Sequence, residues 1–143
     1  MRSPTYLRIA AVLTFVHCLG HTARTMLSQP ESGTSQTIVI QTMRSYVFNF
    51  AGFRHSYWDF YRGFGWFLTV QLASQGIAFW YFASLAKAPS SQLRPILWIF
   101  ALNFAVMAIL SFRYFTLGPI IIEMAIAACF VGSIVSTPSQ DCH

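Results

Sequence analysis

The chain has 143 residues, of which 55% are hydrophobic, 17% aromatic and 9% charged, a composition that fits one domain by length and excludes an ordinary soluble globular protein. The net charge of +5 comes from basic residues scattered along the chain, which excludes a basic nucleic-acid-binding arm and a nucleic-acid partner. We therefore predict a single integral membrane domain over residues 1–143.

The first expected membrane span covers residues 5–27. This stretch is long enough for a helix to cross a hydrocarbon core of about 30 Å. Its hydrophobic face is interrupted in its last three turns, by His17, His21 and Arg24. The polar segment 28–37 contains Pro30 and Gly33 and is expected to end the helix.

Residues 36–52 follow a different pattern. Val39, Met43, Val47 and Phe50 recur at three- and four-residue steps, and polar residues occupy the other faces. The segment is too polar to span a bilayer. The pattern predicts an amphipathic helix lying in the membrane interface.

Three more apolar segments are predicted to span the membrane, at residues 56–86, 96–115 and 120–136. A turn at 87–95 and a break at Gly118 and Pro119 separate them, and a small polar tail follows at 137–143. The expected fold is all-α: an up-down bundle of four transmembrane helices, with an interfacial amphipathic helix between helices one and two. This topology places both termini on the same side of the membrane.

An up-down bundle brings the end of the first span and the start of the fourth into one leaflet. His21 stands six residues before Leu27, and Glu123 stands six residues after Leu117. At 1.5 Å per residue, both side chains are expected about 9 Å inward from their helix ends. Asp59, Arg62 and Arg113 fall at shallower positions in the same leaflet.

A carboxylate at this depth costs about 3 kcal/mol on insertion scales, so Glu123 is expected to face inward toward a partner. Its candidate partners are His21, Arg62 and Arg113. Asp59 has Arg62 three residues on, or Arg54 before the helix, as its expected ion-pair partner.

These residues suggest a partly hydrated pocket that binds a lipid-like, isoprenoid or quinone molecule. If the protein is an enzyme, which the sequence leaves open, His21 would be the proton donor or acceptor, Glu123 its acidic counterpart and Asp59 an orienting or second acid group. Proton-shuttling isomerisation is the reaction class that such groups support. The expected ligand-contacting residues are Tyr57, Trp58, Tyr61, Arg62, Phe64 and Arg113.

Two alternatives stay open. In the first, the protein is a non-catalytic membrane scaffold or subunit, and the same polar residues satisfy one another and fix the helix register. In the second, His17 and His21, one helical turn apart, join Glu123 in a metal site. The chain offers no second histidine pair and no Cys-x-x-Cys motif, so we favour the absence of a metal site. The sequence leaves the cofactor unknown, and we predict none.

Residues 20–22 read Gly-His-Thr, and residues 56–65 read Ser-Tyr-Trp-Asp-Phe-Tyr-Arg-Gly-Phe-Gly. In these motifs the chain resembles a family of small, uncharacterised bacterial membrane proteins with four helices. The resemblance covers most of the chain and implies a multi-pass protein, but it implies no activity. We expect a bacterial inner-membrane location with both termini in the cytoplasm, membrane lipids as partners, and a homo-oligomer as an open alternative.

Overall fold

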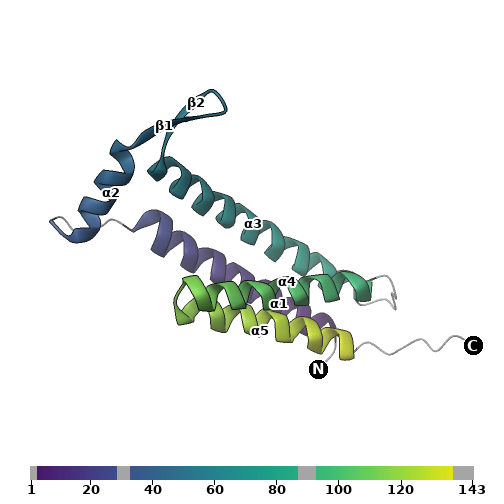
Figure 1. Cartoon of the computed structure of the whole chain (residues 1–143). Coiled ribbons are helices and arrows are strands. Elements are labelled where there is room, and N and C mark those ends of the chain that lie inside the picture. The colour runs from purple at the N-terminus through teal and green to yellow at the C-terminus, as the bar shows by residue number, and fades with distance from the viewer. Residues whose placement is uncertain (1–2, 29–32, 87–92, 137–143) are drawn as a thin grey trace, which may run out of the picture. The chain divides into compact units, whose positions relative to one another are not determined.

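The computed structural model describes residues 3–28, 33–86 and 93–136. Within these residues the chain forms five α-helices, one π-helical segment and one two-stranded antiparallel sheet (Figure 1). The predicted all-α class is therefore confirmed, with a small hairpin added. The predicted connections at 28–37 and 87–95 lie partly outside the described residues, and the predicted tail at 137–143 lies entirely outside them.

The long helices match the predicted segments to within three residues at each end, if the first helix is counted together with the π-helical segment that continues it. In chain order, the elements are α1 (Ser3–His21), the π-helical segment η1 (Thr22–Leu27), α2 (Ser35–Ser45), β1 (Val47–Phe50), β2 (Phe53–Ser56), α3 (Tyr57–Leu85), α4 (Leu93–Tyr114) and α5 (Leu117–Val135). The first predicted span thus changes to π-helical geometry in its last six residues.

The predicted helix over residues 36–52 is wrong in its second half. The helix α2 ends at Ser45, and β1 and β2 then pair as an antiparallel hairpin. Ala51 and Gly52 form its two-residue turn with φ values of +53° and +87°. Positive φ at both turn positions matches the right-handed twist of paired strands. Aromatic residues on alternate positions favour a strand over a helix here.

Of the four predicted membrane spans, two are supported by their length and composition. Among the described residues, α4, with 22 residues, and α5, with 19, are long and apolar enough to cross a membrane, and most residues of each are not buried. Polar side chains lower the hydropathy of the other two long helices. They include Arg8 and His17 in α1, and Gln71 and Gln75 in α3.

Contacts within the chain divide it into two compact units. The first unit comprises Met1–Cys18 and Leu72–His143, and the second comprises Leu19–Gln71. The helices α1 and α3 each run across the boundary between them. The residues predicted to form one site are therefore distributed over both units.

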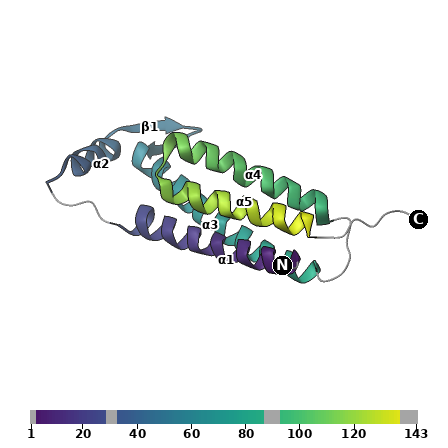
Figure 2. The ribbon, with the colours of Figure 1, turned by 90° about the horizontal axis from the view of Figure 1, so that it is seen from below.

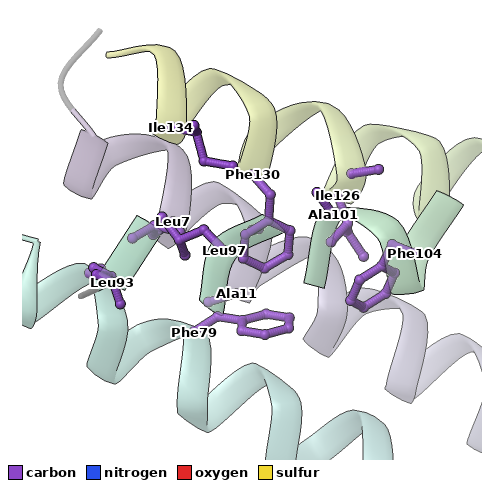
Figure 3. Packing of buried hydrophobic residues seen from close by; sticks show 13 residues of the cluster. Leu7, Ala11, Phe79, Leu93, Leu97, Ala101, Phe104, Ile126, Phe130 and Ile134 are labelled. Atoms are coloured by element: carbon purple, nitrogen blue, oxygen red, sulfur yellow. The ribbon is translucent and has the colours of Figure 1, made fainter. Parts of the chain in front are cut away.

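The first unit has a core built from α1, α3, α4 and α5. The apolar members of its cluster recur every three or four residues along each helix, as one buried face of a helix requires. Figure 3 shows Phe79 from α3 and Phe130 from α5 directed toward each other, with ring centroids 4.8 Å apart in an edge-to-face arrangement. The helices α4 and α5 lie side by side over most of their length (Figures 1 and 2).

Candidate functional site

Asp59 forms a capping box at the start of α3. The backbone N–H and the hydroxyl of Ser56 both donate to Oδ2 of Asp59, at 2.7 Å and 2.8 Å, and the backbone N–H of Asp59 donates back to the Ser56 hydroxyl at 3.2 Å. This reciprocal pairing satisfies N–H groups that the first turn of a helix leaves without partners. The backbone and side-chain hydrogen bonds from Ser56 lower the pKa of Asp59.

The predicted ion pair of Asp59 with Arg62 or Arg54 is not found among the described residues. The Nη1 atom of Arg62 instead donates to the carbonyl oxygen of Met26 at 2.6 Å, in the last turn of η1. The guanidinium of Arg62 also lies 5.9 Å from the ring centroid of Trp66. Arg62 therefore satisfies a carbonyl at a helix end, where intrahelical donors run out.

His21 takes part in a hydrogen-bond network centred on the carbonyl oxygen of Gly65. The Nε2 atom of His21 lies 3.1 Å from this oxygen, and the Thr69 hydroxyl donates to it at 3.2 Å. Thr22 Oγ1 lies 3.1 Å from Thr69 Oγ1, and since the Thr69 proton points to Gly65, Thr22 is the donor. A carbonyl only accepts, so Nε2 of His21 carries a proton and Nδ1 is its basic atom in the neutral ring.

The predicted ligand-contacting aromatic residues divide between two ring groups of the second unit. Trp58 stacks on Tyr61 at 5.4 Å between centroids, with the Arg44 guanidinium 5.0 Å from the Trp58 ring. Tyr57 stacks on Tyr46 at 5.3 Å. Phe64 is 69% exposed and contacts only the ring of Phe60 among the described aromatic pairs.

Phe60 is the centre of the larger ring group and was missed in the sequence. Its ring contacts the rings of Phe48, Phe50, His55 and Phe64, at 5.5, 5.8, 5.7 and 6.3 Å. Three of these partners come from the hairpin. Only the hairpin register brings them to the start of α3, so the helical interpretation of residues 47–52 concealed this cluster.

Glu123 occupies the first position of the buried face of α5. It is 2% exposed, and the same face continues through Ile126 and Phe130. Its carboxyl group hydrogen-bonds the hydroxyl of Ser111, the last buried residue of α4. The second carboxyl oxygen, Oε2, is buried and has no hydrogen-bond partner among the described residues.

Arg113 is not the partner of this carboxyl group. It is exposed, and its guanidinium lies 5.5 Å from the ring of Tyr114. Ser111, two residues earlier, was not predicted, because its role depends on which face of α4 meets α5.

The predicted site residues thus fall into two sets. Glu123 and Arg113 belong to the first unit, whereas the others, His21, Tyr57, Trp58, Asp59, Tyr61, Arg62 and Phe64, belong to the second. The juxtaposition of His21 with Glu123 stays a prediction. The described ranges 3–28, 33–86 and 93–136 contain no group of three His, Cys, Asp or Glu residues placed to hold a metal ion, and the alternative set His17, His21 and Glu123 forms no such group.

Comparison with known proteins adds no relative: no protein-family model, curated protein or solved structure matches the chain. The resemblance in the two sequence motifs therefore remains a prediction.

Proposed function

We propose that the protein is a multi-pass membrane protein that binds an amphipathic small molecule, of lipid, isoprenoid or quinone type, through Glu123. The proposal rests on one observation: a carboxyl oxygen on the buried face of α5 that has no hydrogen-bond partner among the described residues. Buried polar groups are normally paired. A hydroxyl or other donor at the polar end of a ligand would satisfy Oε2 while its apolar part lies among the helices.

The exposed surface of α4 and α5 supports a lipid environment. Large apolar side chains stand fully outward on both helices, including Phe112 at 80%, Ile109 at 68% and Ile121 at 64% exposure. Contiguous apolar surface of this kind is rare on monomeric soluble proteins. In the proposed arrangement, α1 and α3 complete four spans. Their polar side chains then face protein or headgroups, and both termini lie in the cytoplasm of a bacterial cell.

The chemistry that such a site offers is proton exchange. Ser111 orients one carboxyl oxygen of Glu123 and leaves the other for the ligand. In the second unit, His21 would take or return a proton at Nδ1, because its Nε2–H is held by the Gly65 carbonyl. Isomerisation fits these groups, since a proton removed from one carbon and returned to another needs no oxidant or reductant. Asp59 would act only by orienting the start of α3.

A scaffold role is the second candidate, and the second unit favours it. The three polar residues predicted for the site in that unit each bind within it: Asp59 to Ser56, His21 to Gly65 and Arg62 to Met26. The first contact caps α3, and the other two hold the end of α1 and η1 against α3. A scaffold would use Glu123 in the same way, as one more contact between helices.

The test is to purify the protein from native membranes in mild detergent and to identify co-purifying lipids by mass spectrometry, together with its absorbance spectrum and metal content. Glu123→Gln keeps the size of the side chain and a partner for Ser111 but removes the acid. We expect it to lose the bound lipid while it stays folded and monodisperse.

Ser133→Ala is the matched control. Ser133 is a fully buried polar residue on the same helix, ten residues and about 15 Å from Glu123 along the axis. It should retain the lipid. An identical lipid profile in the wild type and in Glu123→Gln would refute the binding site. Loss of folding in Glu123→Gln, with Ser133→Ala intact, would favour the scaffold.

A further inference from the structure

The segment between η1 and α3 presents an exposed surface that is both apolar and basic. Side chains of β1, β2 and the flanking residues stand outward, with Phe53 at 70%, Phe50 at 60% and Tyr46 at 58% exposure. Arg44 and Arg54 are exposed on the same segment, and Arg54, which pairs with Asn49, lies at the tip on the opposite face of the hairpin from Phe50 and Phe53. We call this set of five residues, Arg44, Tyr46, Phe50, Phe53 and Arg54, the hairpin surface.

The hairpin is built to hold aromatic rings at its tip. The register pairs Phe48 with His55 and Phe50 with Phe53, so these four side chains lie on one face of the two strands. The inner pair rests on Phe60 of α3, with centroids 5.5 and 5.7 Å away. The outer pair flanks the turn. Phe50 also contacts the Phe60 ring, at 5.8 Å, but both rings of this pair stay exposed.

The hairpin surface carries positive charge without local neutralisation. Residues 33–56 contain Arg44 and Arg54 but no Asp or Glu. The acids on either side of this range are Glu31, which lies outside the described residues, and Asp59, which is held by Ser56 in the capping box. Arg44 lies over the Trp58 ring, which orients its guanidinium but leaves the charge. A partner for this surface should therefore be anionic.

The length of α3 supports a bilayer surface as that partner. Its 29 residues follow β2 without a break and measure about 44 Å at 1.5 Å per residue. A hydrocarbon core is about 30 Å thick. A membrane-spanning α3 that uses this extra length at its first turns would extend into the headgroup layer, and the hairpin joined to its first residue would lie at that level.

From these observations we infer that the hairpin surface docks onto an anionic phospholipid bilayer, with Phe50 and Phe53 inserted among the headgroups and Arg44 and Arg54 bound to lipid phosphates. The inference rests on the membrane location in the proposed function but not on a ligand at Glu123. Aromatic rings at the interface and arginines near anionic lipid are both favourable.

The test places a nitroxide spin label at the tip of the hairpin in the full-length protein. Ala51→Cys supplies the attachment site after the native thiols are removed by Cys18→Ala, Cys129→Ala and Cys142→Ser. The protein is reconstituted into nanodiscs of phosphatidylcholine alone or mixed with phosphatidylglycerol. Accessibility to oxygen and to a water-soluble nickel complex then measures the ratio of immersed to aqueous label.

We expect the label to be immersed in the mixed lipid and more aqueous in phosphatidylcholine alone. Arg54→Gln should lower the immersed-to-aqueous ratio about fivefold in the mixed lipid, and Arg44→Gln with Arg54→Gln about 25-fold, since each basic residue contributes a similar factor near an anionic surface. Arg94→Gln, which removes an exposed arginine from the first turn of α4, is the matched control and should change nothing.

Three outcomes would overturn the inference: an aqueous label in both lipids, an immersed fraction equal in both lipids, or a short distance between labels showing that a second copy covers the tip. Arg44 and Arg54 are exposed, so their replacement leaves the fold intact. Glu123→Gln should leave the label immersed, so loss of the ligand at Glu123 and loss of hairpin docking are separate results.

Discussion

Glu123→Met is the most direct test of whether the buried carboxyl group serves folding or binding. The substitution keeps the length of the side chain on the buried face of α5 and removes both carboxyl oxygens. An unsatisfied buried polar group costs about 1–3 kcal/mol, and the hydrogen bond to Ser111 that is lost is worth about 0.5–1.5 kcal/mol. The net expectation is an increase of about 1 kcal/mol in the free energy of unfolding.

The assay is unfolding in detergent micelles, followed by heat and by denaturant titration. A gain of about 1 kcal/mol should raise the Tm by about 3 °C for a chain of this length. The same variant should lose any co-purifying lipid. A ligand site predicts higher stability together with lost binding, because the residues of such a site lower the stability of the unliganded protein.

A companion substitution checks the role of Ser111. In the wild type, Ser111→Ala removes the only partner found for the carboxyl group among the described residues and should cost about 1 kcal/mol. In the Glu123→Met background, Ser111→Ala should leave the free energy of unfolding almost unchanged, since the serine hydroxyl can hydrogen-bond within its own helix. A loss of more than about 2 kcal/mol in Glu123→Met itself would refute the reasoning, because it would mean that the carboxyl group is fully paired in the fold.

The start of α3 and the close contact at Gly76 provide two further tests. Ser56→Ala should lower the free energy of unfolding by about 1 kcal/mol through loss of the cap, measured by circular dichroism during denaturant titration. Hydrogen bonds from Ser56 lower the pKa of Asp59 in the folded protein. Ionised Asp59 therefore stabilises the folded state fully above the ordinary pKa of 3.8, and this stabilisation is lost as the pH falls through the lower folded pKa. An acid-unfolding profile of Asp59→Asn identical to that of the wild type would contradict this. Gly76→Ala would place a Cβ 2.9 Å from the Phe15 ring and should lower the free energy of unfolding by about 1–3 kcal/mol. Gly63 has open space around it, so Gly63→Ala should raise the free energy of unfolding by up to about 1 kcal/mol. Equal shifts in the Tm of the two glycine variants would argue against the close contact.

Helix positions could be predicted because the long apolar runs end at clear breaks. The segments at 56–86 and 120–136 correspond to α3 and α5, and Gly118 and Pro119 mark the start of α5 as helix-initial residues do. Hydrophobic length alone did not decide which helices can span a membrane. Arg8 and His17 in α1 lower the hydropathy of a segment whose apolar residues otherwise suffice.

The hairpin could have been found from the sequence. Apolar steps of three and four residues through Val47 and Phe50 fit a helix, but Phe48 and Phe50 also stand on either side of Asn49, as alternate residues of a strand do. The deciding signal is Gly52, which suits the positive φ of a two-residue turn. Ala51 weakens that signal, because a residue with a Cβ rarely adopts its φ of +53°.

The capping box was also visible, as Ser56 followed three residues later by Asp59 directly before an apolar run. The expectation of an ion pair with Arg62 placed two charges one turn apart and overlooked the backbone N–H groups nearer to the carboxylate. At a helix start, hydrogen bonds to nearby backbone N–H groups compete with any ion pair that a carboxylate could form. The pairing of Glu123 with Ser111 could not be found in this way, because it depends on how two helices are rotated against each other.

The polar residues of this chain differ in whether a helix end with unpaired backbone groups lies within hydrogen-bonding distance. Asp59 and Arg62 lie where a helix begins or ends, and unpaired backbone N–H or carbonyl groups there supply partners within a few ångströms. Glu123 lies past the first turn of α5 on a buried face, where the backbone groups bond to one another. Only another side chain or a ligand can satisfy its second oxygen. A buried polar residue in the body of a helix therefore needs a partner from outside its own helix, whereas the charged residues at the start of α3 do not.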